Sequence, residues 1–164
     1  MSGEWDEQIE AIYATADERT EEETLAAVLK LCDERPPDDP AALFERAGAY
    51  DYVGREAEAE PLYRQALAAG LAGDRRTQAV IQLASTLRNL GRAGEGAALL
   101  TGEVAAAPAD DGYADARAAF LALTLLDSGR PDEAVGWAVR ALAGHMKDYR
   151  RALTYYAEEL LDRS

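Results

Sequence analysis

A chain of 164 residues is long enough to bury an ordinary hydrophobic core as one compact domain. Ile and Val together number nine, and two Phe stand beside eight Tyr, which is too little β-branched and aromatic material for a sheet and predicts an all-α fold. The net charge of −14 leaves no basic face for phosphates, which excludes nucleic-acid binding and argues against an anionic membrane surface.

The acidic charge is concentrated in the first part of the chain. Residues 1–60 hold 18 acidic and 5 basic residues, a balance of −13, whereas residues 61–164 hold 13 acidic and 12 basic residues. This distribution permits a basic partner segment, but solvated acidic helix faces are common and provide the simpler interpretation.

The N-terminal segment predicts two helices and no targeting signal. Residues 1–6 lack the positive and apolar stretches of a secretory signal, and no run of 18 apolar residues is present, so we expect a cytoplasmic protein. Thr20 to Glu23 has the form of a capping box that starts the second helix. The first helix, over residues 5–16, is expected to place on one face Trp5, Ile9, Tyr13 and Ala16. We interpret residues 1–36 as a helix pair that is either a degenerate repeat or a separate N-terminal element.

The single cysteine, Cys32, excludes an internal disulfide and a cysteine-based zinc site. It continues a helical apolar pattern with Leu25, Val28 and Leu29, which favours a buried core thiol over a reactive one.

Three glycines mark an internal repeat. Gly54, Gly91 and Gly129 each end a helical stretch, at spacings of 37 and 38 residues, with apolar or small residues at helical intervals on both sides. Glycine suits such a turn because the residue after a helix often takes a left-handed conformation. We therefore predict pairs of antiparallel helices over residues 39–69, 74–107 and 112–145.

The two ends of this repeat array carry their own signals. Asp39 can cap the first repeat, and Pro40 fits the first turn of its helix. Asp148 is expected to cap a final helix over residues 148–163 that covers the last repeat, with one face formed by Leu153, Tyr156, Leu160 and Leu161.

At residues 43–50 (LFERAGAY) and 84–91 (ASTLRNLG) the chain resembles the tetratricopeptide repeat, over about residues 39–145. It is similar to a subset of small bacterial repeat proteins in which the first repeat is followed by a longer linker, here residues 68–73. The repeats are longer than the usual 34 residues. Gly96 stands where a helix-packing Ala is usual, and Glu103 replaces another small residue. The resemblance implies a right-handed superhelical solenoid without a cofactor.

In that family the first helices of successive repeats line a concave groove that binds extended or helical peptides. Carried over by position, the groove is lined by Phe44, Gly48, Asp51 and Tyr52, then by Gln78, Ile81, Ser85, Arg88 and Asn89, and then by Ala119, Leu123, Leu126 and Asp127. The candidate partner-binding residues among these are Phe44, Asp51, Tyr52, Gln78, Ser85, Arg88, Asn89 and Asp127. The family's clamp for a peptide carboxylate needs several Lys, Arg and Asn residues, and the two offered here, Arg88 and Asn89, do not support one.

Asp51 and Arg88 admit two interpretations. Each lies three residues before the turn glycine of its repeat, so the two occupy equivalent places on neighbouring first helices. They either form an ion pair between repeats, or Arg88 anchors a carboxylate or backbone group of a bound peptide. Phe44 and Tyr52 are similarly divided between packing and partner contact.

The sequence shows no catalytic set. His145 is the single histidine and has no Ser or Cys near it, which favours a solvated or capping role. The glycines between Gly91 and Gly96 follow a helix rather than a strand, so they form a turn and not a phosphate loop. We expect no enzyme, no metal and no cofactor.

These observations favour an adaptor that binds a peptide or partner protein in its groove. The alternative is self-assembly, in which Leu123, Leu126 or the tyrosines Tyr155 and Tyr156 join two copies, so both a monomer and a homodimer stay open. A small-molecule-sensing or enzymatic domain would need a deep pocket with strongly shifted ionisable groups.

Overall fold

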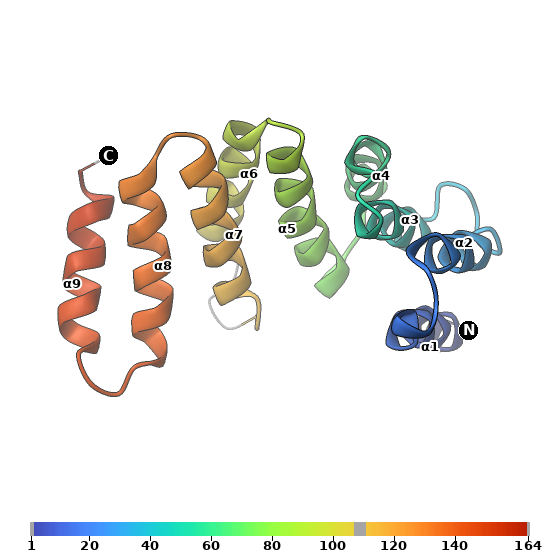
Figure 1. The fold of residues 1–164 in the computed structure, drawn as a ribbon, viewed down its shortest axis with the longest axis horizontal. Helices are drawn as coiled ribbons and strands as arrows, with labels where there is room; N and C mark the ends of the chain where they lie inside the picture. Colours follow the sequence, from blue (N-terminus) through green and yellow to red (C-terminus); the bar gives the residue numbers. More distant parts are fainter. Residues whose placement is uncertain (1, 107–110, 164) are drawn as a thin grey trace. The chain divides into compact units, whose positions relative to one another are not determined.

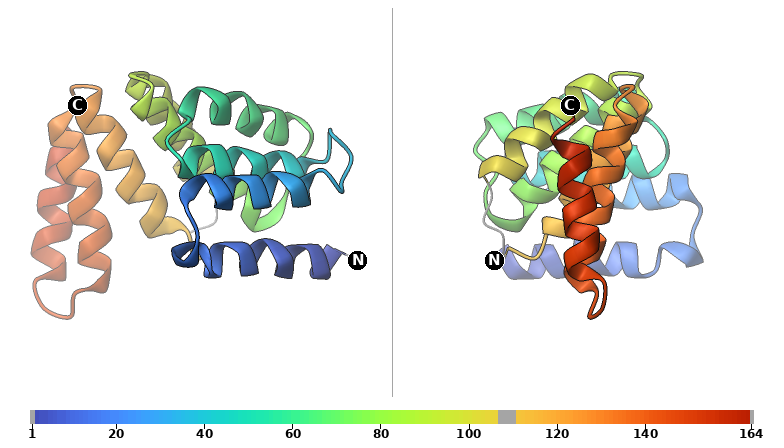
Figure 2. Two further views of the ribbon diagram at one scale, coloured as in Figure 1. Left: turned by 45° about the vertical axis from the view of Figure 1, so that its right-hand side comes forward. Right: turned by 90° about the vertical axis from the view of Figure 1, so that its left-hand side faces the viewer.

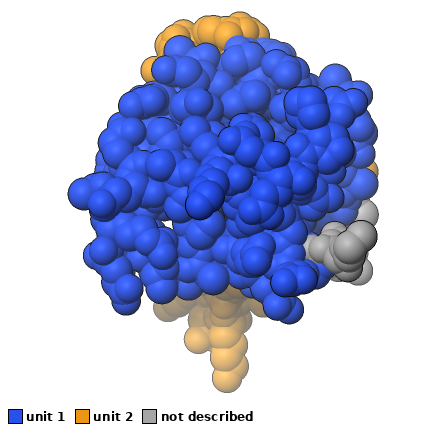
Figure 3. All heavy atoms as spheres, turned by 90° about the vertical axis from the view of Figure 1, so that its right-hand side faces the viewer, with its two compact units in different colours: residues 1–82 blue, residues 83–164 orange. Residues whose placement is uncertain are grey.

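The computed structural model describes residues 2–106 and 111–163, and every regular element in these ranges is a helix. The chain divides into two compact units, residues 1–82 (unit 1) and residues 83–164 (unit 2), coloured separately in Figure 3. The all-α prediction is confirmed. No described helix is both long enough and apolar enough to cross a membrane.

Unit 1 is built from helices that pack in chain order. Its elements are α1 (Ser2–Ala14), the short 3₁₀ helix η1 (Ala16–Glu18), α2 (Glu21–Cys32), α3 (Pro40–Tyr52), α4 (Glu56–Ala68) and the first part of α5 (Gly73–Asn89). Helix α1 packs on α2, α2 on α3, and α3 on α4, as Figures 1 and 2 show. Consecutive antiparallel helices bury their apolar faces against each other without any strand.

The predicted helix starts of unit 1 are confirmed. The Thr20 hydroxyl accepts a hydrogen bond from the Glu23 amide at 3.2 Å, and the Thr20 amide donates to the Glu23 carboxylate at 2.8 Å. Asp39 accepts from the Ala42 amide at 2.9 Å, with Pro40 in the first turn of α3. Both caps satisfy amides that have no partner within their own helix.

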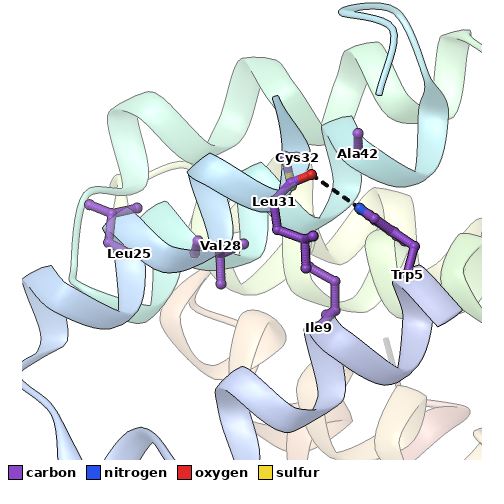
Figure 4. Packing of buried hydrophobic residues seen from close by; sticks show 8 residues of the cluster. Trp5, Ile9, Leu25, Val28, Leu31, Cys32 and Ala42 are labelled. Carbon is purple, nitrogen blue, oxygen red and sulfur yellow. Dashed lines mark hydrogen bonds between the residues drawn. The ribbon is translucent and has the colours of Figure 1, made fainter. Parts of the chain in front are cut away.

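The core between α1 and α2 explains how the first helix joins unit 1. Trp5 and Ile9 are buried against Leu31 and Cys32 of α2, as Figure 4 shows. The Trp5 indole N–H donates to the Leu31 carbonyl at 3.2 Å, so the polar atom of this buried ring is satisfied. Cys32 is fully buried, and burial raises the pKa of its thiol to about 12, which keeps it protonated and inert.

Unit 2 continues the same construction. It contains the rest of α5, then α6 (Ala93–Ala106), α7 (Ala114–Asp127), α8 (Pro131–His145) and α9 (Arg150–Leu161). Helix α6 packs on α7, α7 on α8, and α8 on α9. Its largest fully buried side chains include Leu87, Leu100, Leu121 and Leu125.

The three turn glycines adopt the left-handed conformation that the sequence predicts. Gly54, Gly91 and Gly129 have φ values of +71°, +76° and +82°, and each follows the first helix of a pair. Gly96 has a different role. A Cβ built on it would lie 2.7 Å from the Ala84 carbonyl oxygen and 3.2 Å from the Thr124 methyl group, so glycine permits a close approach of helices there.

Two predicted boundaries differ from the structure. Helix α1 ends at Ala14, and Ala16 belongs to η1, so the expected helix over residues 5–16 is too long at its C-terminal end. Asp148 does not cap α9: the residue before that helix is Tyr149, with φ of +63° and no side-chain cap. The Asp148 prediction is wrong because the chain turns through Tyr149 instead. Residue 1 and residue 107, which bound two predicted segments, lie outside the described residues.

Candidate functional site

Unit 1 contains a hollow of about 850 Å³ that α1, α3, α4 and the start of α5 line together. Four of the predicted partner-binding residues, Phe44, Asp51, Tyr52 and Gln78, lie in its lining. Phe44 is buried, and Tyr52 is 44% exposed. Of these two aromatic rings, Tyr52 therefore presents far more surface to a partner.

A partly buried ion-pair network joins the helices that line the hollow. The Arg75 guanidinium lies 2.9 Å from a Glu45 carboxylate oxygen and 2.9 Å from an Asp6 carboxylate oxygen. It also lies 5.6 Å from the centre of the Trp5 ring, within the range of a cation–π contact. One side chain of α5 thus ties α1 to α3.

The Glu45 carboxyl is the most buried ionisable group of this network, at 8% exposed. Burial raises its pKa above the ordinary glutamate value, and the hydrogen bond and charge of Arg75 offset only part of that effect. A buried carboxylate that depends on one guanidinium indicates a structural role for this pair.

Three tyrosines and Phe44 form the aromatic part of the lining. Tyr13 and Tyr52 meet edge to face, with ring centres 6.2 Å apart. The fully buried Tyr63 places its hydroxyl 3.3 Å from an Asp51 carboxylate oxygen and 3.0 Å from the Gln82 side-chain oxygen. Burial first, and the Asp51 charge second, raise the pKa of Tyr63 well above its usual value, so its hydroxyl stays a donor.

The lining is strongly acidic. Among the described residues that form it, Arg75 is the one basic side chain, against the five carboxylates of Asp6, Glu10, Glu45, Asp51 and Asp74. Glu10 and Asp74 are exposed to solvent. The hollow therefore offers negative charge and aromatic surface to a ligand.

The other four predicted residues belong to unit 2. Ser85 is half-buried and Asn89 is exposed on α5, and the Arg88 guanidinium lies 2.5 Å from the Asp127 carboxylate of α7. The predicted pair between Asp51 and Arg88 would join the two units and stays a prediction. The Asp127 pairing was not anticipated from the sequence, although both residues had been assigned to the same groove.

Sequence reasoning missed five of the six charged residues that line the hollow. Asp6, Glu10, Asp74 and Arg75 come from α1 and from the first turn of α5, and Glu45 of α3 was not among the candidates either. The sequence feature that pointed to α1 was the apolar face of the first helix, which indicated that this helix packs against the rest of the chain.

Two titratable side chains of unit 2, Arg117 and His145, lie against carboxylates. Arg117, only 3% exposed, makes two hydrogen bonds to the Asp111 carboxylate, at 2.6 and 2.8 Å. His145 is exposed, in agreement with the predicted solvated role, and its ring nitrogen lies 2.8 Å from the exposed Asp115 carboxylate, which links α8 to α7. No group of three or more potential metal ligands occurs within residues 2–106 and 111–163.

Comparison with known families gives the decisive match. A family model described as tetratrico peptide repeat matches residues 40–160, from the first residue of α3 into α9, which is almost three quarters of the chain. The chain belongs to the tetratricopeptide-repeat family. The searches of curated proteins and of solved structures found no match.

Membership of the tetratricopeptide-repeat family explains the helix pairs and indicates a general role in protein–protein interaction. This tetratricopeptide-repeat protein has the solenoid type of all-α fold, in which each helix pair buries its apolar face against its neighbours. The family consists of protein–protein interaction modules, which are generally non-enzymatic scaffolds. The match includes the segment of α9, so the helix that we expected to cover the last repeat falls within the family pattern.

Proposed function

We propose that this tetratricopeptide-repeat protein is an adaptor that binds a basic segment of a partner protein in the hollow of unit 1. The observation that carries the proposal is the lining itself: five carboxylates and one guanidinium surround about 850 Å³ of space, beside an exposed tyrosine. Charge of one sign in a concave surface attracts a partner of the other sign.

The ion pairs of Arg75 leave other carboxylates of the lining available to a positively charged side chain of the partner. Arg75 already takes the carboxylates of Glu45 and Asp6, and this pairing fixes the floor of the hollow before any partner arrives. A partner Lys or Arg then meets Glu10 and Asp74, which are exposed in the lining. A lining held rigid in advance reduces the entropy lost on binding.

Tyr52 is the predicted anchor for the apolar part of the segment. Its ring is 44% exposed and is held edge-on by Tyr13, so it loses little freedom when a partner covers it. Aromatic residues with one apolar face and one polar tip are typical binding hot spots. A cationic side chain can also lie over the ring.

The test measures fluorescence anisotropy of a short labelled peptide in which Lys and Leu alternate. The double variant Glu10→Gln, Asp74→Asn removes two exposed carboxylates of the lining and should weaken binding about fivefold, at ~0.5 kcal/mol for each exposed charge. Tyr52→Ala should weaken it about tenfold. Circular dichroism of each variant checks that the helices are retained.

A matched control is available in the same unit. Asp17→Asn, Glu18→Gln changes the net charge equally on η1, outside the lining of the hollow, and should leave the affinity unchanged. Equal weakening by both double variants would show that the peptide responds to overall charge and not to the hollow, and the proposal would then fail.

The exposed leucines of α7 support self-assembly as a second candidate function. Leu123 and Leu126 of α7 are 42% and 53% exposed, so that helix presents two large apolar side chains to solvent. Sedimentation velocity over a concentration series tests this second candidate, and the Leu123→Ser, Leu126→Ser double variant should remain a monomer throughout. A wild-type chain that stays monomeric at every concentration would rule it out.

A further inference from the structure

The segment that joins α8 to α9, together with the first half of α9, gathers exposed aromatic surface; we name residues 147–156 the α8–α9 corner. Tyr149, Tyr155 and Tyr156 are 79%, 66% and 57% exposed, and together they line a shallow depression of unit 2. The rings of Tyr155 and Tyr156 meet edge to face, with centres 5.7 Å apart. Large exposed aromatic surface of this kind marks interaction sites.

The corner carries the opposite charge to the hollow of unit 1. Lys147, Arg150 and Arg151 stand against Asp148, a local balance of +2 in a chain with a net charge of −14. Arg150 holds the loop, because its guanidinium donates to the carbonyls of Met146 and Gly144 at 3.1 and 2.9 Å. The positive charges of Lys147 and Arg151 are exposed at the surface.

The backbone of Tyr149 adds an independent observation. Its φ of +63° is the one positive value at a non-glycine position within residues 2–106 and 111–163. A residue with a Cβ takes this conformation at a cost in free energy that glycine avoids. The chain nevertheless places there the most exposed of its described large apolar side chains. Strain retained at an exposed aromatic residue points to a role in contact rather than in folding.

We propose that the α8–α9 corner is a second binding surface, separate from the hollow, and that it takes an acidic segment of a protein partner. Tyrosine supplies rigid apolar contact with a polar tip, and arginine pairs with carboxylates in two-pronged geometry, so both are enriched where proteins bind proteins. The excess of basic over acidic residues selects an acidic segment over a basic one.

A short acidic protein segment suits the corner better than a nucleic acid does. A nucleic acid carries charge continuously along its backbone, and the remainder of this acidic chain would repel it beyond the corner. A short segment places its few carboxylates near Lys147 and Arg151, and salt screens the rest of the protein beyond a distance of about 10 Å.

The experiment measures anisotropy of a labelled peptide in which Glu and Leu alternate, with the Lys and Leu peptide as its reversed-charge counterpart. Tyr149→Gly removes the ring and relieves the left-handed backbone, so the melting temperature should stay equal or rise while the affinity falls about tenfold. Arg151→Glu reverses one exposed charge and should also weaken binding about tenfold. Lys30→Glu makes the same change in charge at an exposed position of α2 and should leave the affinity unchanged.

Four results would overturn the inference. Two concern the peptide: the wild-type chain does not bind the Glu and Leu peptide, or Lys30→Glu weakens its binding as much as Arg151→Glu does. The third is tighter binding of a single-stranded DNA probe at the same surface, and the fourth is self-association in sedimentation velocity that Tyr149→Gly abolishes. The last result would make a second copy of this chain the occupant. Because the corner variants leave Glu10 and Asp74 intact, failure here is separable from failure of the hollow.

Discussion

Substitution of Gly96 by alanine tests how closely the helices approach in unit 2. An added Cβ would lie 2.7 Å from the Ala84 carbonyl oxygen, closer than real Cβ atoms come to other atoms, and 3.2 Å from the Thr124 methyl group. The first contact is with backbone, so α5 and α6 have to move apart to relieve it. Overpacking of this kind costs about 1–3 kcal/mol.

The same substitution also has a favourable component. Alanine in a helix interior is more favourable than glycine by about 1 kcal/mol, because glycine loses more backbone freedom on folding. Subtracting this gain from the overpacking cost leaves a net loss of ~0–2 kcal/mol for Gly96→Ala. For a chain of this length, each kcal/mol shifts the melting temperature by about 2–4 °C.

Gly102→Ala provides the control within the same helix. Gly102 lies in α6, is exposed, and has no atom within 4 Å of an added Cβ, so the substitution should stabilise unit 2 by about 1 kcal/mol. Urea unfolding followed by circular dichroism measures both variants. The close-packing argument would be refuted if Gly96→Ala were as stable as Gly102→Ala.

Three further predictions concern the pairs and caps. Arg75→Gln leaves the buried Glu45 carboxylate without its partner and should destabilise unit 1 by ~2 kcal/mol at neutral pH in urea unfolding. Because burial raises the pKa of Glu45, the carboxylate is protonated as the pH falls and the destabilisation should become smaller; a pH-independent destabilisation would contradict this. Thr20→Ala removes a cap and should cost about 1 kcal/mol in the same assay, whereas an unchanged midpoint would show that the capping box contributes nothing. Hydrogen bonds from Arg117, and then from the Tyr113 amide, hold the pKa of Asp111 below its ordinary value, so the stability they provide is present above about pH 4 and is lost below it. Arg117→Met keeps only the Tyr113 bond, so its stability should fall less steeply on acid titration, and a wild-type slope would refute the assignment.

Two surfaces of opposite charge on one chain suit an adaptor that holds two different segments. The hollow is acidic with an exposed Tyr52, and the α8–α9 corner is basic with three exposed tyrosines. The two peptides test the surfaces separately, because the Lys and Leu peptide should bind the acidic hollow and the Glu and Leu peptide should bind the basic corner.

The sequence by itself determined the local features of this protein. The capping box at Thr20, the cap at Asp39 and the left-handed turns at Gly54, Gly91 and Gly129 were all predicted, because each depends on residues within about four positions along the chain. The same periodic signals identified the repeat and therefore the family. Where a local rule failed, as at Asp148, the alternative turn used a conformation at Tyr149 that residue preferences disfavour.

Only the tertiary structure decided how these helices make a site. Arg75 reaches Asp6 across 69 positions of the sequence, and Arg88 reaches Asp127 across 39, so neither pairing follows from periodicity. Gly96 departed from the family pattern in the sequence, and the structure explains it by the nearness of the Ala84 carbonyl oxygen. Helix formation is governed by neighbours along the chain, whereas the charge and shape of the hollow depend on which helix faces meet, and that is settled by side-chain packing between distant segments.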